Sequence, residues 1–325
     1  MAAVTVSGST SLGRRLGRVL RRRLLQVIPT LAGVSLVTFV LVRLLPGGPV
    51  QTLVGVRATP ASIAAVSRQL GLSRPLIDQY ISYLSQLGHG NLGYSFLTGT
   101  SVTSIVATHL VVTLELIALA VILALLAGIP LATLAAYRRS GWEDQVVRAT
   151  TVATLGVPSF WLGILLITYL GLRLNWFPSG GNGSGFFGGL DHLFLPALTL
   201  ALTFLAVVVR SLRASVSDIL RTDHVDAARL KGISRLRVLS RHILRVASLP
   251  VVALVGLNMS YLLGTSVIVE NVFALPGMGQ QLVSAILQRD FLVVQGITLV
   301  FGLIVILISI AVDLVQAALD PRSAG

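Results

Sequence analysis

The sequence predicts an all-α polytopic membrane protein with six transmembrane helices. Hydrophobic residues make up 54% of the 325 positions, charged residues only 11%, and the mean hydropathy is +0.87. A soluble protein of this length could not bury so much apolar surface. The apolar segments are about twenty residues long rather than alternating strands of about ten, so they predict spanning helices and not a barrel.

The net charge of +13 could indicate nucleic acid as a partner. The basic residues, however, gather in a few stretches beside apolar segments, as membrane topology requires, so we expect no nucleic-acid binding. The chain has no cysteine, which excludes disulfides and thiol chemistry. Lys231 is the only lysine among the 25 basic residues.

The N-terminal third predicts one span and one external segment. Residues 1–23 predict a cytosolic N-terminal tail rich in arginine, and residues 24–45 the first transmembrane helix. This run has spanning length and no small-residue cleavage site after it, so we interpret it as a retained helix rather than a signal peptide. Residues 46–111 predict an extracytoplasmic insertion, with helices over 59–71 and 75–87 and a loop over 88–96.

Residues 112–319 predict a core of five further spans, followed by a cytosolic tail over 320–325. Pro158 predicts a kink in the second of these spans. One span carries small residues four apart, which predict a smooth face for close helix packing: Ala120, Ala124, Gly128, Ala132 and Ala136. The five spans are expected at 112–136, 148–172, 193–212, 249–269 and 292–319.

The distribution of basic residues predicts the orientation of these helices. Nineteen of the 25 lie in segments that this topology places in the cytosol, five lie in external segments, and Arg43 lies at the outer end of the first span. The positive-inside rule therefore predicts that both termini are cytosolic.

A polar, basic stretch over residues 223–250 interrupts the apolar core. Asp223 predicts the start of a short helix, and Gly232 its end. A second helix from Ser234 to Pro250 would place Arg237, Arg241 and Arg245 on one face and apolar side chains on another. A helix of this kind is expected to lie at the membrane surface, with its cations toward lipid headgroups.

Motifs for catalysis or cofactor binding are missing from the sequence. Lys231 is flanked by Leu230 and Gly232, so it cannot belong to a phosphate-binding P-loop. The GxGxxG match at 183–188 lies in a Gly-rich loop without the strand and helix that a dinucleotide site needs. The five histidines have no ligand spacing, and no nucleophile elbow is present. We therefore expect no catalytic residue, metal or cofactor in this chain.

Two acidic residues fall within the predicted spans, Glu115 near the outer end and Asp313 near the inner end. Both positions are interfacial, and Asp313 is expected to meet basic residues or water. Neither residue lies at mid-depth, where a charge is most costly and most often functional. This pattern argues against an ion-coupled secondary carrier, one alternative function, and the well-formed spans argue against a membrane-anchored scaffold, another.

Asp226-Ala227-Ala228, followed by Gly232 and then Leu249-Pro250, resembles the EAA loop of ATP-binding-cassette importer permeases, with Asp in place of Glu. The long spacing to Pro250 is similar to the dipeptide/oligopeptide/nickel (DppB/OppB-type) branch of that family. Further stretches along nearly the whole chain resemble the same branch: LLPGGP (44–49), LGLSRPL (70–76), GNLGYSF (90–96), VENVFALPGMG (269–279), RDFLVVQG (289–296) and LDPR (319–322).

The resemblance implies a type I ABC importer (MetI-like) permease core plus one extra N-terminal helix, in the bacterial cytoplasmic membrane. It implies a second homologous permease subunit, two ATPase subunits that bind ATP and Mg, and an extracytoplasmic solute-binding protein, beside membrane lipid. The expected function is import of di- and oligopeptides by alternating access, without enzymatic activity in this chain. Nickel or another small solute is the alternative substrate.

The resemblance also assigns roles to residues. The expected ATPase-coupling residues are Asp226, Ala227, Ala228, Lys231 and Gly232. Asn258, Ser260 and Thr265 are candidates for the translocation path, whereas the small-residue stripe of Gly256, Ser260 and Gly264 either lines the path or packs helices, with packing favoured. Candidates for contact with the external binding protein are Glu270, Phe273, Pro276 and Gly277.

Overall fold

The computed structural model describes residues 8–44, 73–95, 97–138, 141–181, 183, 185–234 and 237–319, and the single positions 59, 61, 64, 67 and 68. Within these residues all regular elements are helical, apart from one isolated bridge between Tyr94 and Ser101. The helix expected over 59–71 lies mostly outside the described residues.

Five helices of the described chain are long and apolar enough to cross a membrane, and one bent pair of helices would make a sixth span. This result confirms the predicted all-α, multispan fold. The five helices are α1 (Gly8–Leu44), α5 (Val102–Tyr137), α8 (Gly185–Ile219), α11 (Leu244–Val272) and α13 (Phe291–Leu319).

The segment over 148–172 is bent sharply at Pro158, which corrects the single kinked helix expected there. Helix α6 (Trp142–Gly156) ends before Pro158, and α7 (Ser159–Leu166) continues into the π-helical segment η1 (Ile167–Arg173). The two halves meet at an angle of 104°. Val157 is extended at φ −94° and ψ 125°, because the ring of the following proline disfavours helical geometry there.

Helix α1 is longer than a span, so residues 8–23 of the expected N-terminal tail are helical. Its 37 residues correspond to about 55 Å of helix, well beyond the apolar core of a bilayer. The apolar window covers only Arg23–Val40. The arginine-bearing turns before Arg23 therefore continue the helix beyond the apolar window.

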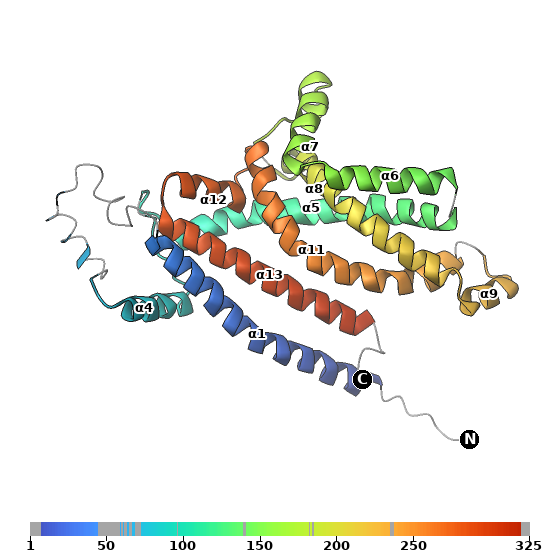
Figure 1. Cartoon of the computed structure of the whole chain (residues 1–325), viewed down its shortest axis with the longest axis horizontal. Coiled ribbons are helices and arrows are strands. Elements are labelled where there is room, and N and C mark those ends of the chain that lie inside the picture. The colour runs from blue at the N-terminus through green and yellow to red at the C-terminus, as the bar shows by residue number, and fades with distance from the viewer. Residues whose placement is uncertain are drawn as a thin grey trace.

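The helices form an elongated bundle with small helices at both ends (Figure 1). α1 and α13 lie side by side, while α6 runs along α5 and α8. α4 (Leu76–Gly88) and α12 (Met278–Leu287) lie at one end. α9 (Asp223–Leu230) lies at the other end, with the start of α1 and the close of α13. We call these the α12 end and the α9 end.

The predicted small-residue face of α5 is confirmed as a packing surface. All five of its residues are buried, and α8 lies against them. A Cβ added at Gly128 would lie 3.0 Å from Cγ1 of Val208. The absence of a side chain therefore lets the two helix backbones approach closely.

α4 matches the helix expected over 75–87 and packs against α1. The ring of Tyr80 lies edge-on to Phe39 at 5.0 Å, and its hydroxyl is 2.9 Å from the hydroxyl of Ser35. Tyr83 stacks on Phe39 at 6.0 Å, and its ring lies 6.5 Å from that of Tyr80. Burial raises the pKa of Tyr83 to about 12, so its phenol stays protonated at ordinary pH. The α4 helix is thus attached to α1 by aromatic contacts.

Candidate functional site

The first half of the predicted coupling loop forms a short helix held against the bundle. In α9, Val225 is 2% exposed and Ala228 is 7% exposed, and both join a buried cluster with Val238 and Ile243. Ala228 was expected to touch an ATPase, and this expectation is corrected, because its side chain faces the protein's own core. Val225 and Ala228 instead attach α9 to the membrane helices.

The opposite face of α9 is open. Ala227, Lys231 and Gly232 are exposed there, and Leu230 has 89% of its surface free. Leu230 was missed at the level of sequence, although an apolar residue beside the single lysine in a polar stretch was a usable signal. The backbone of Asp226 lies within α9, and its side chain is outside the described residues.

Gly232 ends α9 as predicted. Its φ is +74°, a left-handed conformation that glycine adopts without strain. The amide of Lys231 donates to the carbonyl of Ala227 at 3.1 Å, and the amide of Ile233 to that of Ala228 at 3.2 Å. These bonds satisfy carbonyls at the end of the helix and turn the chain sharply.

The second half of the loop is not a separate surface helix ending at Pro250, which corrects that expectation. A π-helical segment η2 (Val238–Ile243) runs directly into α11, whose helix continues through position 250. Burial of Val238, Ile243 and Ala247 explains the difference, because the apolar face packs on the bundle core. Arg237 is exposed, as expected, and the side chains of Arg241 and Arg245 lie outside the described residues.

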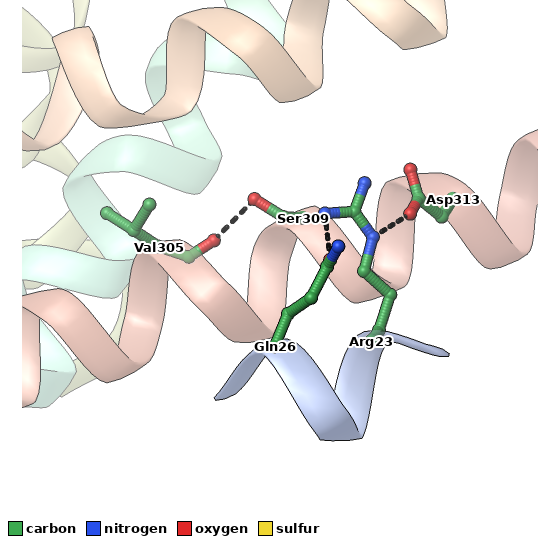
Figure 2. Close-up of polar contacts among 5 residues, drawn as sticks. All are labelled: Arg23, Gln26, Val305, Ser309 and Asp313. Atoms are coloured by element: carbon green, nitrogen blue, oxygen red, sulfur yellow. Dashed lines mark hydrogen bonds and ion pairs between the residues drawn. The ribbon is translucent and has the colours of Figure 1, made fainter. Parts of the chain in front are cut away.

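Ion pairs join the helices toward the α9 end. Arg213 of α8 and Asp144 of α6 form a bidentate pair, and Asp144 is 2% exposed. Arg23 of α1 pairs with Asp313 of α13, and its guanidinium also donates to Gln26 at 3.3 Å (Figure 2). The expected basic partner of Asp313 is thereby confirmed.

The three candidates for the translocation path have different environments. Ser260 is exposed, Asn258 is half-buried, and Thr265 is 6% exposed. The amide of Asn258 donates to the carbonyl of Leu254, and the hydroxyl of Thr265 to that of Tyr261, each at 2.8 Å. Of the three, Ser260 alone presents an open side chain, in this single chain.

Ser260 belongs to an open stripe along α11. Leu257 is 77% exposed and Tyr261 58%, and a Cβ added at Gly264 would meet nothing within 4 Å. Gly256 lies off this stripe: a Cβ there would come within 2.6 Å of Val312 on α13. The two glycines of the predicted stripe therefore differ, one packing against a helix and the other facing open space.

The external-contact candidates are mostly interior. Glu270 is 0% exposed, Phe273 1%, and Gly277 is also buried, while Pro276 is half-buried. A side chain without free surface cannot touch another protein in this conformation, so for Glu270, Phe273 and Gly277 the expected direct contact is corrected. Their exposed neighbours are Asn271 and Ala274.

Metal chemistry finds no support in the described part of the chain, where no three His, Cys, Asp or Glu side chains gather as ligands. The expected absence of a cofactor concerns the whole chain and stays a prediction.

Two family models match this sequence. Residues 128–325 match the binding-protein-dependent transport system inner membrane component, and residues 16–117 match the N-terminal model of such membrane components. Together they cover the segment 46–111, most of the helical bundle and α9.

Similar proteins cover almost the entire chain. A putative peptide transport system permease protein of Brucella suis is 38% identical over 304 residues, 93% of this chain and 97% of that protein. The glutathione transport system permease protein GsiC of Escherichia coli K12 is 38% identical over 300 residues, 92% of this chain and 96% of that protein. A chain of the inward-facing MetNI methionine ABC transporter shares the fold, with a TM-score of 0.57 and 17% identity, over 66% of this chain and 96% of that chain.

Proposed function

The chain belongs to the binding-protein-dependent transport system inner membrane components, the permease subunits of ATP-binding-cassette importers, and we propose that it translocates peptides. A permease of this family is not itself an enzyme. ATP is hydrolysed by partner ATPase subunits, and a substrate-binding protein delivers the solute. The proposal concerns which solute passes and which residues serve each partner.

Peptide specificity is supported by the relatives. Proteins named as peptide and glutathione permeases share 38% of their residues with this chain over more than nine-tenths of its length. Glutathione is itself a tripeptide, so both names describe short peptide-like solutes. This common chemistry is the single observation that carries the substrate proposal.

α9 is the proposed docking element for an ATPase. Ala227, Leu230 and Lys231 form its free face, and Gly232 permits the tight turn that exposes them. The buried side chains of Val225 and Ala228 connect the same helix to the core. Motion of an ATPase against α9 would therefore be passed to the membrane helices through packed side chains rather than through a flexible loop.

The orientation follows from the same proposal. The α9 end would face the cytosol, together with both termini and the arginine-bearing turns of α1, and the α12 end would face outward. The insertion over 46–111 would then lie outside, and Asn271 and Ala274 would be free for the binding protein. A second homologous permease subunit would cover the open stripe of α11 with the path between them, and lipid would cover the remaining apolar faces.

Reconstitution tests this function. Proteoliposomes would contain the chain, its partner permease and the ATPases, with the binding protein added on the side that the α12 end faces. They should take up a radiolabelled di- or tripeptide only when ATP is supplied on the opposite side. An ATPase variant that binds but does not hydrolyse ATP is the matched control. Uptake driven by an ion gradient without ATP, or uptake of nickel but of no peptide, would overturn the proposal.

A further inference from the structure

Glu270 lies at the C-terminal end of α11, and both of its carboxylate oxygens accept hydrogen bonds. The hydroxyl of Thr113, on α5, donates to Oε1 at 2.9 Å. The amides of Gly279 and Gln280, in the first turn of α12, donate to Oε2 at 2.6 and 3.1 Å. One buried side chain therefore joins three helices.

Thr113 has a second role in this network. Its hydroxyl oxygen accepts a hydrogen bond from the amide of Met278 at 2.9 Å while it donates to Glu270. The first amides of a helix have no partner within the helix and carry its positive dipole end. Glu270 and Thr113 thus accept hydrogen bonds from three of these amides in α12. The bonds stabilise the start of α12 and also orient this helix relative to α5 and α11.

The surrounding backbone fits closely around the carboxylate. A Cβ added at Gly277 would lie 2.4 Å from Oε2 of Glu270, and one added at Gly279 would lie 2.8 Å from the same atom. The amide of Leu275 donates to the main-chain carbonyl of Glu270 at 2.9 Å. The chain from 270 to 280 is thus folded closely around its own carboxylate, and Gly277 and Gly279 leave the room that this group occupies.

The network extends to the segment before α8. The amide of Gly181 donates to the carbonyl of Phe273 at 3.0 Å, and a Cβ added at Gly180 would lie 2.5 Å from that oxygen. Phe273 itself is buried in a cluster with Leu116 of α5 and Leu195 of α8. The α12 end of the bundle is therefore joined by polar and apolar contacts together.

We propose that Glu270 is a positioning residue that makes the ends of α5, α11 and α12 move as one rigid body during transport. The proposal rests on the alternating-access function given above, and the residue itself touches neither substrate nor partner. Conformational change at this end then occurs between this body and other subunits, not between α5 and α12. The exposed edge at Asn271 and Ala274 is carried by the same body.

Spin labels test the rigid body directly, and the natural absence of cysteine makes the labelling clean. Val111 of α5 is 53% exposed and Leu287 of α12 is 78% exposed, so cysteines there should be labelled without disturbing the core. The distance between the labels should be the same in nucleotide-free and ATP-trapped complexes. A shift of the distance distribution between these states, in complexes that import peptide, would overturn the proposal.

Substitutions distinguish the effect of the Glu270 hydrogen bonds from the effect of helix packing alone. Thr113→Val and Glu270→Ala, present in the membrane at normal levels, should broaden the label distance and lower maximal uptake about tenfold. Thr113→Ser, which keeps the hydroxyl, should retain both properties, and the half-saturating concentration of binding protein should not change in any variant.

An unchanged, narrow distribution of label distances together with full uptake in Glu270→Ala would overturn the proposal. Failure of the unsubstituted complex to import peptide would refute the proposed function. The label distance would still show whether α5 and α12 move together.

Discussion

Arg213 and Asp144 face one another in a two-point ion pair, with Nε 2.5 Å from Oδ1 and Nη2 2.6 Å from Oδ2. The pair joins α8, which leads into α9, to the first turn of α6. Because Asp144 is almost fully buried, its charge depends on this partner for compensation. The bent helix pair is thereby fixed to the helix that precedes the proposed coupling element in the chain.

Asp144→Asn should weaken the fold, because it removes the negative charge and leaves Arg213 one acceptor oxygen where the carboxylate offers two. We expect a loss of about 2 kcal/mol in the free energy of unfolding, measured by denaturant titration in detergent. The neighbouring Glu143→Gln is the matched control, since its partner Arg138 is 60% exposed and the loss should be much smaller. Equal losses for the two variants would contradict the assignment.

Gly232→Trp should leave the protein in the membrane and abolish ATP-coupled uptake, because a large side chain would block docking at α9. The left-handed φ of +74° adds a backbone strain that is independent of docking. Gly232→Asn controls for this strain, since asparagine tolerates that conformation better than other residues do. Normal transport and ATPase assembly with Gly232→Trp would refute the coupling role.

Leu230→Ser should weaken binding of the ATPase subunits by about ten- to a hundredfold, since burying a leucine in an interface contributes roughly 1.5–3 kcal/mol. Stability should barely change, because Leu230 makes little contact within its own chain. Co-purification at graded ATPase concentrations measures the effect. Leu287→Ser, on an equally exposed residue at the α12 end, should bind ATPases normally; a similar loss there would show that the effect is not local.

Asp313→Asn should have only a modest effect on stability, at most about 1 kcal/mol. The side chains of Arg23 and Asp313 are 38% and 25% exposed, so solvent screens their attraction. Arg23→Gln should give a loss of the same size, and the double variant should lose no more than either single one. Additive losses in thermal unfolding would mean that the two residues act independently.

Gly256→Ala and Gly264→Ala should behave differently although the two residues lie eight positions apart on one helix. A methyl group at Gly256 would collide with Val312, so we expect about 1–3 kcal/mol of destabilisation. A methyl group at Gly264 meets no atom of its own chain and should leave the fold intact. Denaturation of the detergent-purified single chain measures the stability of both variants. Equal stabilities would contradict the close packing of Gly256 against Val312.

The fold was largely predictable because bilayer thickness fixes the length and composition of spanning helices. Composition and apolar periodicity gave the spans, and the alanine spacing gave the close contact of α5 and α8. The sharp turn at Pro158 was harder to predict, because a proline permits a kink of any size and neighbouring helices decide the angle.

The site was less predictable, because burial depends on contacts between distant residues. The side-chain direction of Ala228 depends on the phase of an eight-residue helix with little apolar pattern. Glu270 looked like an external loop residue, and its interior position depends on Thr113, which lies 157 positions away. Local sequence indicated candidate segments, but not which of their side chains face outward.

The single lysine of the chain makes α9 chemically distinguishable from all other segments. Lys231 is exposed at the end of the proposed docking helix, and every other basic side chain apart from histidine is an arginine. Acylating reagents that attack primary amines therefore have one side-chain target, besides any free terminal amine. Mass spectrometry of acetylated protein would give a footprint of α9 in native membranes, where shielding of Lys231 would report the fraction of permeases that carry a motor subunit.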